Sequence, residues 1–309
     1  MLVTGGAGFI GSHTVDALLG EGVSVSALDD LSTGTLRNLL AWKKNKKLHF
    51  RRGSTLQRNL VRSLVHRVDA VIHLAAVVSP YYSVKEPERV NAVNVNGTLN
   101  ILNAALRHKI QRLVFASSSS VYGDQKELPI TEDNPLHPIT PYGASKLSGE
   151  QYCGAYNRTY GLSTVALRYF NVYGERQSAN PYSGVIAIFS KQLKRGVRPK
   201  IFGDGLQTRD FIHVSDVVKA NLLALSTRKG VGDAFNIGTG HSATINALVS
   251  LLSGLSGKPE ITPIHVSARA GDIRYSFANV CKAREILRFQ PKVELNKGLQ
   301  SLSRSNALG

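Results

Sequence analysis

A tyrosine and a lysine one helical turn apart form the first pattern that could carry chemistry. Tyr142 and Lys146 stand in a YxxxK pattern, so on a helix their side chains share one face. A lysine ammonium beside a phenol stabilises the phenolate, which makes such a tyrosine a general base near neutral pH. The pattern predicts proton transfer between this tyrosine and a substrate hydroxyl.

The same spacing occurs at two other places. Tyr81 and Lys85 lie between a strand end and a proline. Tyr122 and Lys126 adjoin a Gly-Asp loop. We expect neither pair to be helical and both tyrosines to lie on the surface. Only Tyr142 begins a long helical pattern directly behind a proline, where the missing N–H costs nothing.

Four consecutive serines, Ser117 to Ser120, end an apolar run that begins at Arg112. Open α/β sheets bind ligands at the carboxyl ends of their strands, so a serine at this edge could hydrogen-bond a reacting hydroxyl. The alternative is a polar strand end capped by its own hydroxyl groups. The serines alone leave both interpretations open.

Glycines at 5, 8 and 11 lie between the first apolar run and the first helical pattern. This spacing provides a tight turn, close approach of the backbone to a pyrophosphate, and a helix N-terminus aimed at it. Asp29 follows 18 residues after Gly11, at the end of the second apolar run. Its carboxylate suits ribose hydroxyls and repels a 2′-phosphate, so the pattern predicts NAD rather than NADP. A P-loop is excluded because no Gly-Lys-Ser/Thr closes the turn.

Strand and helix patterns alternate strictly through the first half, which predicts parallel βαβ units. The expected strands are 2–4, 23–28, 47–50, 70–74, 112–116 and 162–168, and the expected helices are 9–19, 56–67, 87–108 and 141–160. Later helices are expected at 182–195, 215–227, 244–256, 279–288 and 295–304. Strands near 211–214 and 235–237 could return to the main sheet.

These elements predict an α/β fold with a doubly wound parallel Rossmann sheet and a smaller, partly interleaved C-terminal α/β domain. Residues 1–171 would form the NAD-binding domain, with return segments near 211–238. Residues 172–309 would mainly bind the substrate.

Composition excludes several classes of protein. The chain has 309 residues, of which 42% are hydrophobic and 19% charged, so it can bury a core and is not disordered. No apolar stretch is long enough to span a membrane, and no signal peptide precedes the first strand, so we expect a cytoplasmic protein without a membrane partner. Two cysteines and no CxxC exclude a disulfide scaffold and a thiolate zinc site, and no metal is expected.

The net charge is +17, which suits a nucleic acid, an anionic membrane or a small polyanionic substrate. The densest basic run lies within residues 43–52. It is either a solvated face or a contact for a polyanion.

The chain resembles the extended short-chain dehydrogenase/reductases, and among them the nucleotide-sugar epimerases of the UDP-glucose 4-epimerase type. The matching segments run through nearly the whole chain in family order: TGGAGFIGSH (4–13), DDLSTG (29–34), HLAA (73–76), NVNGT (94–98), SSSSVYGD (117–124), PYGASK (141–146), RYFNVYG (168–174), GDGLQTRDFIHVSD (203–216), NIGTG (236–240) and RAGDIR (269–274).

The resemblance implies a catalytic set, a cofactor site and a substrate site. Tyr142 would be the base, Lys146 would lower its pKa and hold the nicotinamide ribose, and Ser118 would touch the sugar O4. The cofactor residues would be Gly5, Gly8, Phe9, Ile10, Gly11, Asp29, Asp30, Ser32, Thr33, Gly34, Ser54, Thr55, Leu74, Ala75, Ala76, Asn94, Tyr142, Lys146 and Tyr169. The substrate residues would be Ser118, Ser119, Ser120, Asn171, Phe202, Arg209, Arg269 and Ser276, with the two arginines on the diphosphate.

The implied reaction is NAD-dependent C4 epimerisation of UDP-glucose and UDP-galactose. The sugar would be oxidised to a 4-keto intermediate, which turns over before hydride returns to its opposite face. The implied partners are a UDP-hexose substrate and a second copy of the chain, packed through the helices at 87–108 and 141–160. Related 4,6-dehydratases carry Asp-Glu just before VYG and decarboxylases carry Glu, whereas this chain has Ser119 and Ser120, which cannot do carboxylate chemistry.

Three departures from the family pattern stand out. The first strand is short, and Ser54-Thr55 replaces the usual Gly-Asp, so an aspartate contact to the adenine is missing. Ser276 occupies the position that resembles a size gate for the sugar, and so small a residue would leave room for an N-acetyl group.

Other functions remain open. The chain could epimerise UDP-GlcNAc/GalNAc, or UDP-glucuronate, because SSSSVYG is also similar to the glucuronate epimerases. It could be a non-catalytic protein that binds NAD and a polyanion such as RNA, although the catalytic set makes nucleic acid an unlikely partner. It could also be a net oxidoreductase that releases NADH.

Overall fold

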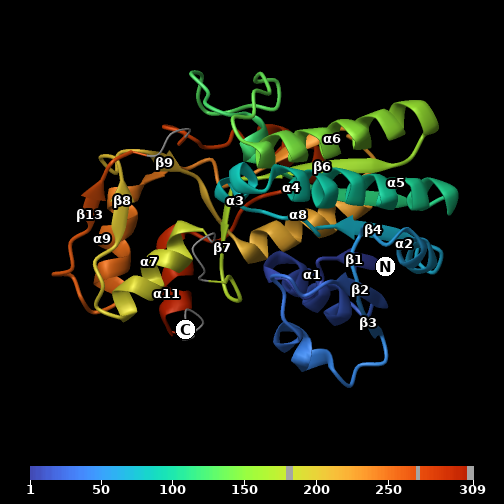
Figure 1. Ribbon diagram of the computed structural model, residues 1–309, viewed down its shortest axis with the longest axis horizontal. Coiled ribbons are helices and arrows are strands. Elements are labelled where there is room, and N and C mark those ends of the chain that lie inside the picture. The colour runs from blue at the N-terminus through green and yellow to red at the C-terminus, as the bar shows by residue number, and fades with distance from the viewer. Residues whose placement is uncertain (179–183, 269–271, 305–309) are drawn as a thin grey trace.

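The main sheet consists of seven parallel strands that alternate with helices along the chain (Figure 1). The computed structural model describes residues 1–178, 184–268 and 272–304. The strands are β1 (Leu2–Thr4), β2 (Val25–Asp29), β3 (Leu48–Arg52), β4 (Ala70–His73), β5 (Arg112–Ser118), β6 (Thr164–Tyr169) and β11 (Ala234–Ile237), in the spatial order β3-β2-β1-β4-β5-β6-β11. The predicted doubly wound sheet is confirmed.

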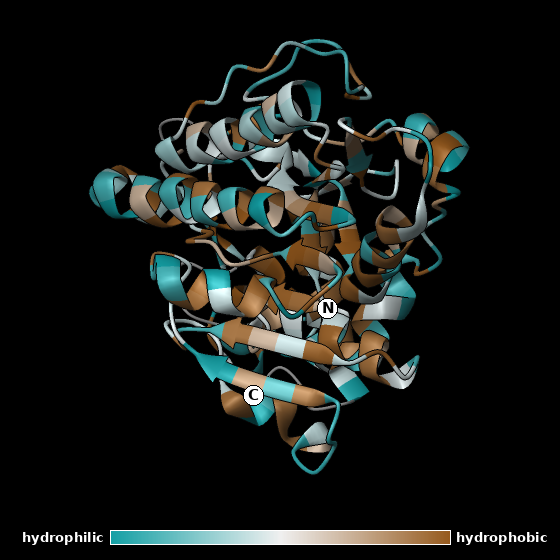
Figure 2. Ribbon diagram, turned by 90° about the vertical axis from the view of Figure 1, so that its right-hand side faces the viewer, coloured by the Kyte–Doolittle hydropathy of each residue, from teal (hydrophilic) through white to brown (hydrophobic). Residues whose placement is uncertain are grey.

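Helices cover both faces of this sheet, because successive strand residues point to opposite sides. Val3 and Ala116 belong to one apolar core with the helices α1 (Phe9–Gly20) and α8 (Val214–Ser226). Leu2 and Phe115 belong to a second core, under α2 (Arg58–Val65), α5 (Gly97–Arg107) and α6 (Pro141–Tyr160). The brown residues of Figure 2 gather between these layers, while the outer helix faces are teal.

Helix α6 begins and ends where local sequence signals predict. Thr140 precedes it, and its hydroxyl oxygen accepts a hydrogen bond from the Gly143 N–H at 3.2 Å. Pro141 takes the first helical position, where no N–H is needed. Gly161 ends the helix at φ +70°, a conformation that costs glycine little. The predicted range 141–160 is therefore confirmed.

The predicted helix over 87–108 is interrupted. It consists of α4 (Pro87–Asn91), a π-helical turn η2 (Ala92–Asn96) and α5. π-turns are rare and often occur at functional sites. The turn contains Asn94, a predicted cofactor residue.

The second half of the chain builds a smaller layer beside the main sheet. Its helices α7 (Val185–Lys194), α9 (Ile245–Leu255) and α11 (Leu295–Arg304) share a core that includes Phe189, Leu252 and Leu299. Three two-stranded sheets accompany them: β7 (Asn171–Tyr173) with β10 (Phe211–His213), β9 (Thr208–Arg209) with β12 (Ala243–Thr244), and β8 (Lys200–Phe202) with β13 (Ile264–Val266).

The two predicted returning strands have different outcomes. β11 joins the edge of the main sheet beside β6 and lies against α10 (Cys281–Leu287). The strand expected at 211–214 does not join that sheet, because β10 pairs in parallel with β7 instead. That part of the prediction is wrong. The first two residues of the helix expected at 182–195 lie outside the described residues.

Both predictions about the other YxxxK pairs need correction. Tyr81 and Lys85 do lie on a helix, the short α3 (Pro80–Lys85), where the Lys85 ammonium sits 4.8 Å from the Tyr81 ring centroid. Tyr122 follows the 3₁₀ turn η3 (Ser119–Val121) and is completely buried rather than on the surface. Tyr81 is 53% exposed, as expected of a surface tyrosine.

No helix in the described ranges is long and apolar enough to cross a membrane.

The close packing of α6 on β5 can be tested at Gly149. A Cβ at this position would lie 2.6 Å from the Phe115 ring. Gly149→Ala is therefore expected to lower the free energy of unfolding by about 1–3 kcal/mol, as overpacking does. The matched control is Gly254→Ala in α9, where a Cβ would meet nothing within 4 Å. That change should raise stability by about 0.5–1 kcal/mol, because alanine favours helix. Urea unfolding of both variants checks this, and equal effects would contradict the packing argument.

Candidate active site

The turn between β1 and α1 requires glycine, because a side chain there would collide with neighbouring backbone atoms. Gly5 has φ +69°, and a Cβ there would lie 3.0 Å from the Ala75 backbone nitrogen. A Cβ on Gly11 would lie within bonding distance of the Gly5 carbonyl oxygen. Gly8 begins α1 without any side-chain cap, so the first helical N–H groups face outward from the turn. Such a helix start is a binding site for phosphate oxygens.

Asp29 ties this turn to the end of β2. One carboxylate oxygen accepts a hydrogen bond from the Ala7 N–H at 2.9 Å, and the other accepts one from the Leu31 N–H at 2.8 Å. Burial raises the pKa of Asp29, and these two hydrogen bonds oppose that rise. The Gly8 N–H bonds the same carboxylate, which leaves one of its four lone pairs for a ribose hydroxyl. The glycine cradle and this carboxylate therefore fit the adenosine diphosphate half of NAD.

A chain of buried hydrogen bonds crosses from β1 to the π-turn and was not predicted from the sequence. The Thr4 hydroxyl lies 2.7 Å from His73 Nδ1, and the Thr98 hydroxyl lies 3.0 Å from His73 Nε2. Burial lowers the pKa of His73 to about 3, so the ring is neutral and bridges the two hydroxyls. Thr4 also accepts the Ala75 N–H at 3.1 Å. The HLAA segment is thus held against the glycine turn by its histidine.

Asn94 uses its side-chain amide to fix two segments around the predicted cofactor site. Its oxygen accepts the Val77 N–H at 2.8 Å, and its nitrogen donates to the Ser145 hydroxyl at 2.9 Å. Ser145 stands between the predicted catalytic residues on α6, and its hydroxyl donates to the Tyr142 carbonyl at 2.8 Å. Asn94 thereby connects the chain after β4 with the first turn of α6.

Ser118 and Tyr142 meet at the end of β5. The Ser118 hydroxyl lies beside the Tyr142 phenol, and both side chains are buried. Burial raises the pKa of Tyr142 above its usual value, and the hydrogen bond from Ser118 opposes this. The hydroxyls of Ser118 and Ser120 lie 3.2 Å apart, because η3 folds the serines back on the strand end. A Cβ on Gly143 would lie 2.6 Å from the Ser120 carbonyl oxygen, so only glycine allows this approach.

Lys146 lies one turn further along α6 and is buried. Its ammonium donates to the Ala116 carbonyl at 2.7 Å and lies 5.2 Å from the Phe115 ring centroid. Burial lowers the pKa of Lys146 to about 8. The expected lowering of the Tyr142 pKa by this lysine is not seen: burial raises the pKa of Tyr142, and the opposing effect comes from Ser118.

Glu150 continues the same helix face and was missed by the sequence analysis. Its carboxylate accepts the Ser117 hydroxyl at 2.7 Å and pairs with Arg168 at 2.5 Å. Arg168 also donates to the Tyr122 hydroxyl at 2.7 Å, and Tyr122 donates to Asn236 at 2.6 Å. The i, i+4, i+8 spacing of Tyr142, Lys146 and Glu150 could have indicated this residue.

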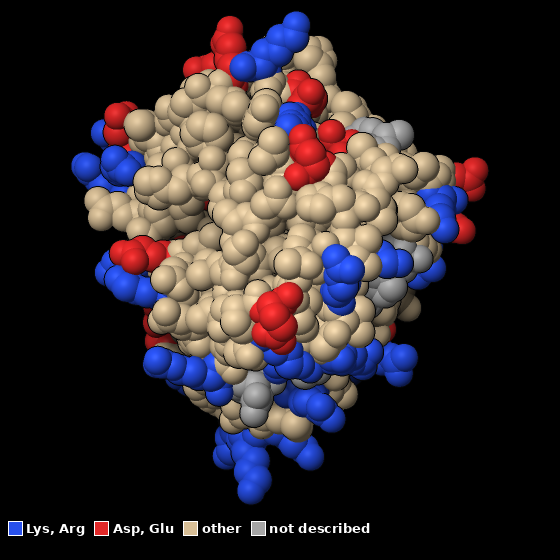
Figure 3. Space-filling view, turned by 90° about the vertical axis from the view of Figure 1, so that its left-hand side faces the viewer, with Lys and Arg blue, Asp and Glu red and all other residues tan. Residues whose placement is uncertain are grey.

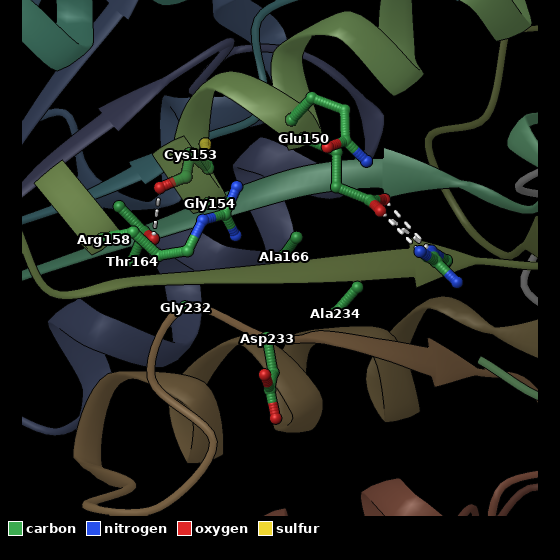
Figure 4. Close-up of a pocket in the computed structure, with 11 residues that line it drawn as sticks. Glu150, Cys153, Gly154, Arg158, Thr164, Ala166, Gly232, Asp233 and Ala234 are labelled. Atoms are coloured by element: carbon green, nitrogen blue, oxygen red, sulfur yellow. Dashed lines mark hydrogen bonds and ion pairs between the residues drawn. The ribbon is translucent and has the colours of Figure 1, made fainter. Parts of the chain in front are cut away.

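This ion pair borders a polar pocket between α6, β6 and β11 (Figure 4). In Figure 4, dashed lines join Glu150 to its arginine, while Arg158 and Asp233 lie toward the other end of the pocket. Tyr142 does not line this pocket. The pocket therefore lies beside the ion pair that contacts Ser117, and not at the proposed reacting residues.

The predicted substrate residues are linked through the backbone of Asp210. The Asn171 N–H donates to the Asp210 carbonyl at 2.9 Å, and the Asp210 N–H donates to the Ser276 carbonyl at 2.9 Å. Ser276 is buried. The Asp210 carboxylate accepts the backbone N–H groups of Thr239 and Gly240, which fixes the NIGTG turn.

Arg209 is mostly buried and already holds partners. It donates to Asp272 at 2.6 Å and to the Thr208 carbonyl at 2.8 Å, and burial lowers its pKa. The guanidinium has five N–H donors, so three remain for phosphate oxygens. Arg269, the second predicted diphosphate residue, lies outside the described residues.

Other predicted cofactor residues are bonded or packed within the protein. Thr55 is buried against Gly97, and Ser54 lies in the loop after β3, where it accepts the Leu56 N–H at 3.2 Å. The Asp30 carboxylate accepts the Ser32 N–H at 2.9 Å. The Tyr169 hydroxyl donates to Asn221 on α8 at 2.5 Å, so its polar end is occupied away from Tyr142.

Comparison with known proteins places the chain in a family. Residues 1–238 match the model of the NAD dependent epimerase/dehydratase family. The UDP-glucose 4-epimerase of Mycolicibacterium smegmatis is 40% identical over 300 residues, which cover 96% of this chain and 95% of that protein. This chain belongs to the NAD dependent epimerase/dehydratase family. The predicted resemblance is confirmed, and NAD is the cofactor of this family.

Two solved structures share the whole architecture. The UDP-glucose 4-epimerase of Thermotoga maritima, solved with UDP-glucose, has a TM-score of 0.93 and 40% identity, covering 98% of this chain and 97% of its own. The UDP-N-acetylglucosamine 4-epimerase of Methanobrevibacter ruminantium, solved with UDP-N-acetylmuramic acid, has a TM-score of 0.92 and 36% identity, covering 98% and 96%.

The buried lysine predicts how stability depends on pH. Between about pH 8 and its unfolded pKa near 10.4, Lys146 is neutral in the folded protein and protonated in the unfolded chain. The unfolded chain then binds more protons, so stability rises with pH. Relative to Lys146→Met, the wild type should gain up to about 1.4 kcal/mol per pH unit in this window and nothing below it.

Urea unfolding at pH 7, 8, 9 and 10 checks this. Lys194→Met, at an exposed position in the last turn of α7, is the control and should give a curve parallel to that of the wild type. A parallel curve for Lys146→Met as well would contradict the lowered pKa.

Proposed function

We propose that this protein interconverts UDP-glucose and UDP-galactose by NAD-dependent epimerisation at C4. The observation that carries the proposal is the meeting of Ser118 with Tyr142 at the end of β5, followed by serines where a dehydratase needs carboxylates. The family membership and the two 40% identical UDP-glucose 4-epimerases support it.

The proposed cofactor site consists of the glycine turn, Asp29 and the segment held by Asn94. The turn would bind the pyrophosphate, Asp29 the adenine ribose, and Lys146 the nicotinamide ribose. NAD, when bound, supplies the redox chemistry by taking hydrogen with two electrons from the sugar C4 and returning them. The other cofactor residues that the family resemblance implies stay predictions.

Tyr142 is the proposed acid and base. Its phenolate accepts the proton of the sugar 4-hydroxyl during oxidation, and its phenol returns that proton during reduction. Ser118 lies beside the phenol and would hold O4 there, so the proton would move over one hydrogen bond. Because burial raises the pKa of Tyr142, the phenolate needs a cation near it, and Lys146 is the buried cation on the same helix face.

The diphosphate is the proposed handle on the substrate. Arg209 keeps free donors, and its mostly buried position strengthens a hydrogen bond to phosphate. Asn171 and Ser276 stand on either side of the Asp210 backbone, at the proposed sugar end. A substrate held by its diphosphate would let the 4-keto sugar turn over without leaving the site.

A UDP-N-acetylhexosamine is the second candidate substrate. The observation that favours it is the small, buried Ser276, and a UDP-N-acetylglucosamine 4-epimerase shares the fold at 36% identity.

We also infer a homodimer packed through the helices of residues 87–108 and 141–160. The exposed Tyr152 and Tyr160 on α6 support that inference. A cytoplasmic location stays a prediction.

The reaction is tested with UDP-galactose, NAD and the purified protein, following the anomeric protons by NMR. UDP-glucose should appear without net NADH. Tyr142→Phe should lower turnover by about 100-fold or more, the typical contribution of a general acid–base group. Tyr152→Phe, exposed on the same helix, should keep full activity. Net NADH release, or an active Tyr142→Phe, would contradict the mechanism.

The size of the sugar pocket is tested by Ser276→Tyr. The larger side chain should abolish conversion of UDP-GlcNAc to UDP-GalNAc and keep most activity on UDP-galactose. The same NMR assay measures both substrates. Equal loss on both substrates, or no loss on either, would show that Ser276 does not set the size of the pocket.

A further inference from the structure

One part of the chain carries most of the net charge, on basic side chains that have no role in the proposed reaction. Between Asp30 and Asp69 the sequence contains ten Lys and Arg residues and no Asp or Glu. This segment alone supplies ten of the net +17 charges. All ten side chains are exposed. None pairs with an acidic side chain within the described part of the chain.

These charges gather at one edge of the main sheet. Lys43, Lys44, Lys46 and Lys47 lie around the turn between η1 (Leu36–Trp42) and β3, which is the edge strand. The six arginines lie on η1, on β3 and on or beside α2. Figure 1 shows the η1 turn at the lower end of the molecule, and blue side chains gather at the same lower end in Figure 3. We call this surface the basic edge.

The basic edge lies away from the reacting residues. Three strands, β2, β1 and β4, separate β3 from β5, which carries Ser118. At the usual spacing of parallel strands, four steps amount to about 19 Å. Figure 2 views the molecule from this end, with β3 and the η1 turn at the bottom.

Exposed leucines interrupt the positive charges. Leu36 and Leu40, four residues apart on η1, are 47% and 57% exposed, and Leu56 before α2 is 41% exposed. Exposed aliphatic side chains within a basic surface are typical of proteins that lie on a bilayer, with leucines in the acyl boundary and lysines at the headgroups. A nucleic acid offers phosphates for the lysines but no apolar layer for the leucines.

Protection of the sheet edge explains only part of this surface. Charged residues on an edge strand prevent pairing with another chain, which accounts for Arg51 and Arg52 on β3. It does not account for the lysines of the turn before β3, nor for the leucines exposed beside them.

We propose that the basic edge docks this protein on an anionic lipid bilayer. The lysine turn contacts the headgroups, and Leu36 and Leu40 enter the boundary between headgroups and acyl chains. Docking of this kind needs no spanning helix, and none is found in the described ranges. It does depart from the sequence-based expectation of a protein without a membrane partner. The proposal is independent of which UDP-sugar the protein converts.

Vesicle flotation tests the proposal with the full-length protein. Vesicles of phosphatidylcholine alone are compared with vesicles containing 30% phosphatidylglycerol, a fraction of the order met in anionic membranes, at low and at physiological salt. The protein should float with the anionic vesicles and stay in solution with neutral ones. The variant with Lys43, Lys44, Lys46 and Lys47 changed to Gln should bind the anionic vesicles at least about tenfold more weakly.

Two further variants separate the contributions. A control with Lys194, Arg195, Lys200 and Lys229 changed to Gln removes four exposed charges elsewhere and should bind like the wild type. Leu36→Gln combined with Leu40→Gln should lose the binding that persists at physiological salt. All variants should keep the thermal midpoint and the turnover of free UDP-galactose, because the changed residues are exposed and remote from Ser118.

Three outcomes would overturn the proposal. One is equal binding to neutral and anionic vesicles. Another is equal loss in the charge-matched control, which would show an unspecific effect of net charge. The third is binding of a duplex RNA with no vesicle binding by the same protein, which would assign the basic edge to nucleic acid.

Discussion

The candidate site depends on the contact of one face of α6 with the end of β5. Tyr142, Lys146 and Glu150 follow one another at helical spacing, and they reach Ser118, the Ala116 carbonyl and Ser117 in turn. Each contact is buried, so a shift of the helix along the strand would leave several polar groups unpaired at once. Because unpaired buried polar groups are costly, the helix keeps its position along the strand, and the phenol, the ammonium and the serines keep their relative positions.

The glycines of α6 and of the turn after β1 make this contact possible. Gly143 and Gly149 let the helix approach the serine turn and the Phe115 ring, and Gly5 and Gly11 let α1 approach the end of β4. The sheet order places β4 between β1 and β5, so the glycine turn and the proposed catalytic residues lie at the same carboxyl end of the parallel strands. His73 and Asn94 connect the two halves with neutral side chains, so Lys146 is the buried cation on the helix face of Tyr142.

Charged side chains are arranged differently near the candidate site and at the basic edge. Near the candidate site the two arginines are paired with carboxylates and Lys146 donates to a backbone carbonyl, since an unpaired buried charge is costly. Arg168 has Glu150, Arg209 has Asp272, and the net positive charge collects instead on the exposed basic edge. The net charge of the chain therefore does not indicate the reaction, but it does indicate an exposed positive surface.

Local sequence alone determined the glycine turn, the strand–helix alternation and the bounds of α6, because caps, prolines and glycines act over a few residues. Only the tertiary structure decided that Tyr122 is buried, that a π-turn carries Asn94 and that β10 pairs with β7. It also decided that Glu150 bonds Ser117 while paired with Arg168, and that burial raises the pKa of Tyr142. These properties depend on partners far away in the chain, since burial and pairing arise only where distant segments meet.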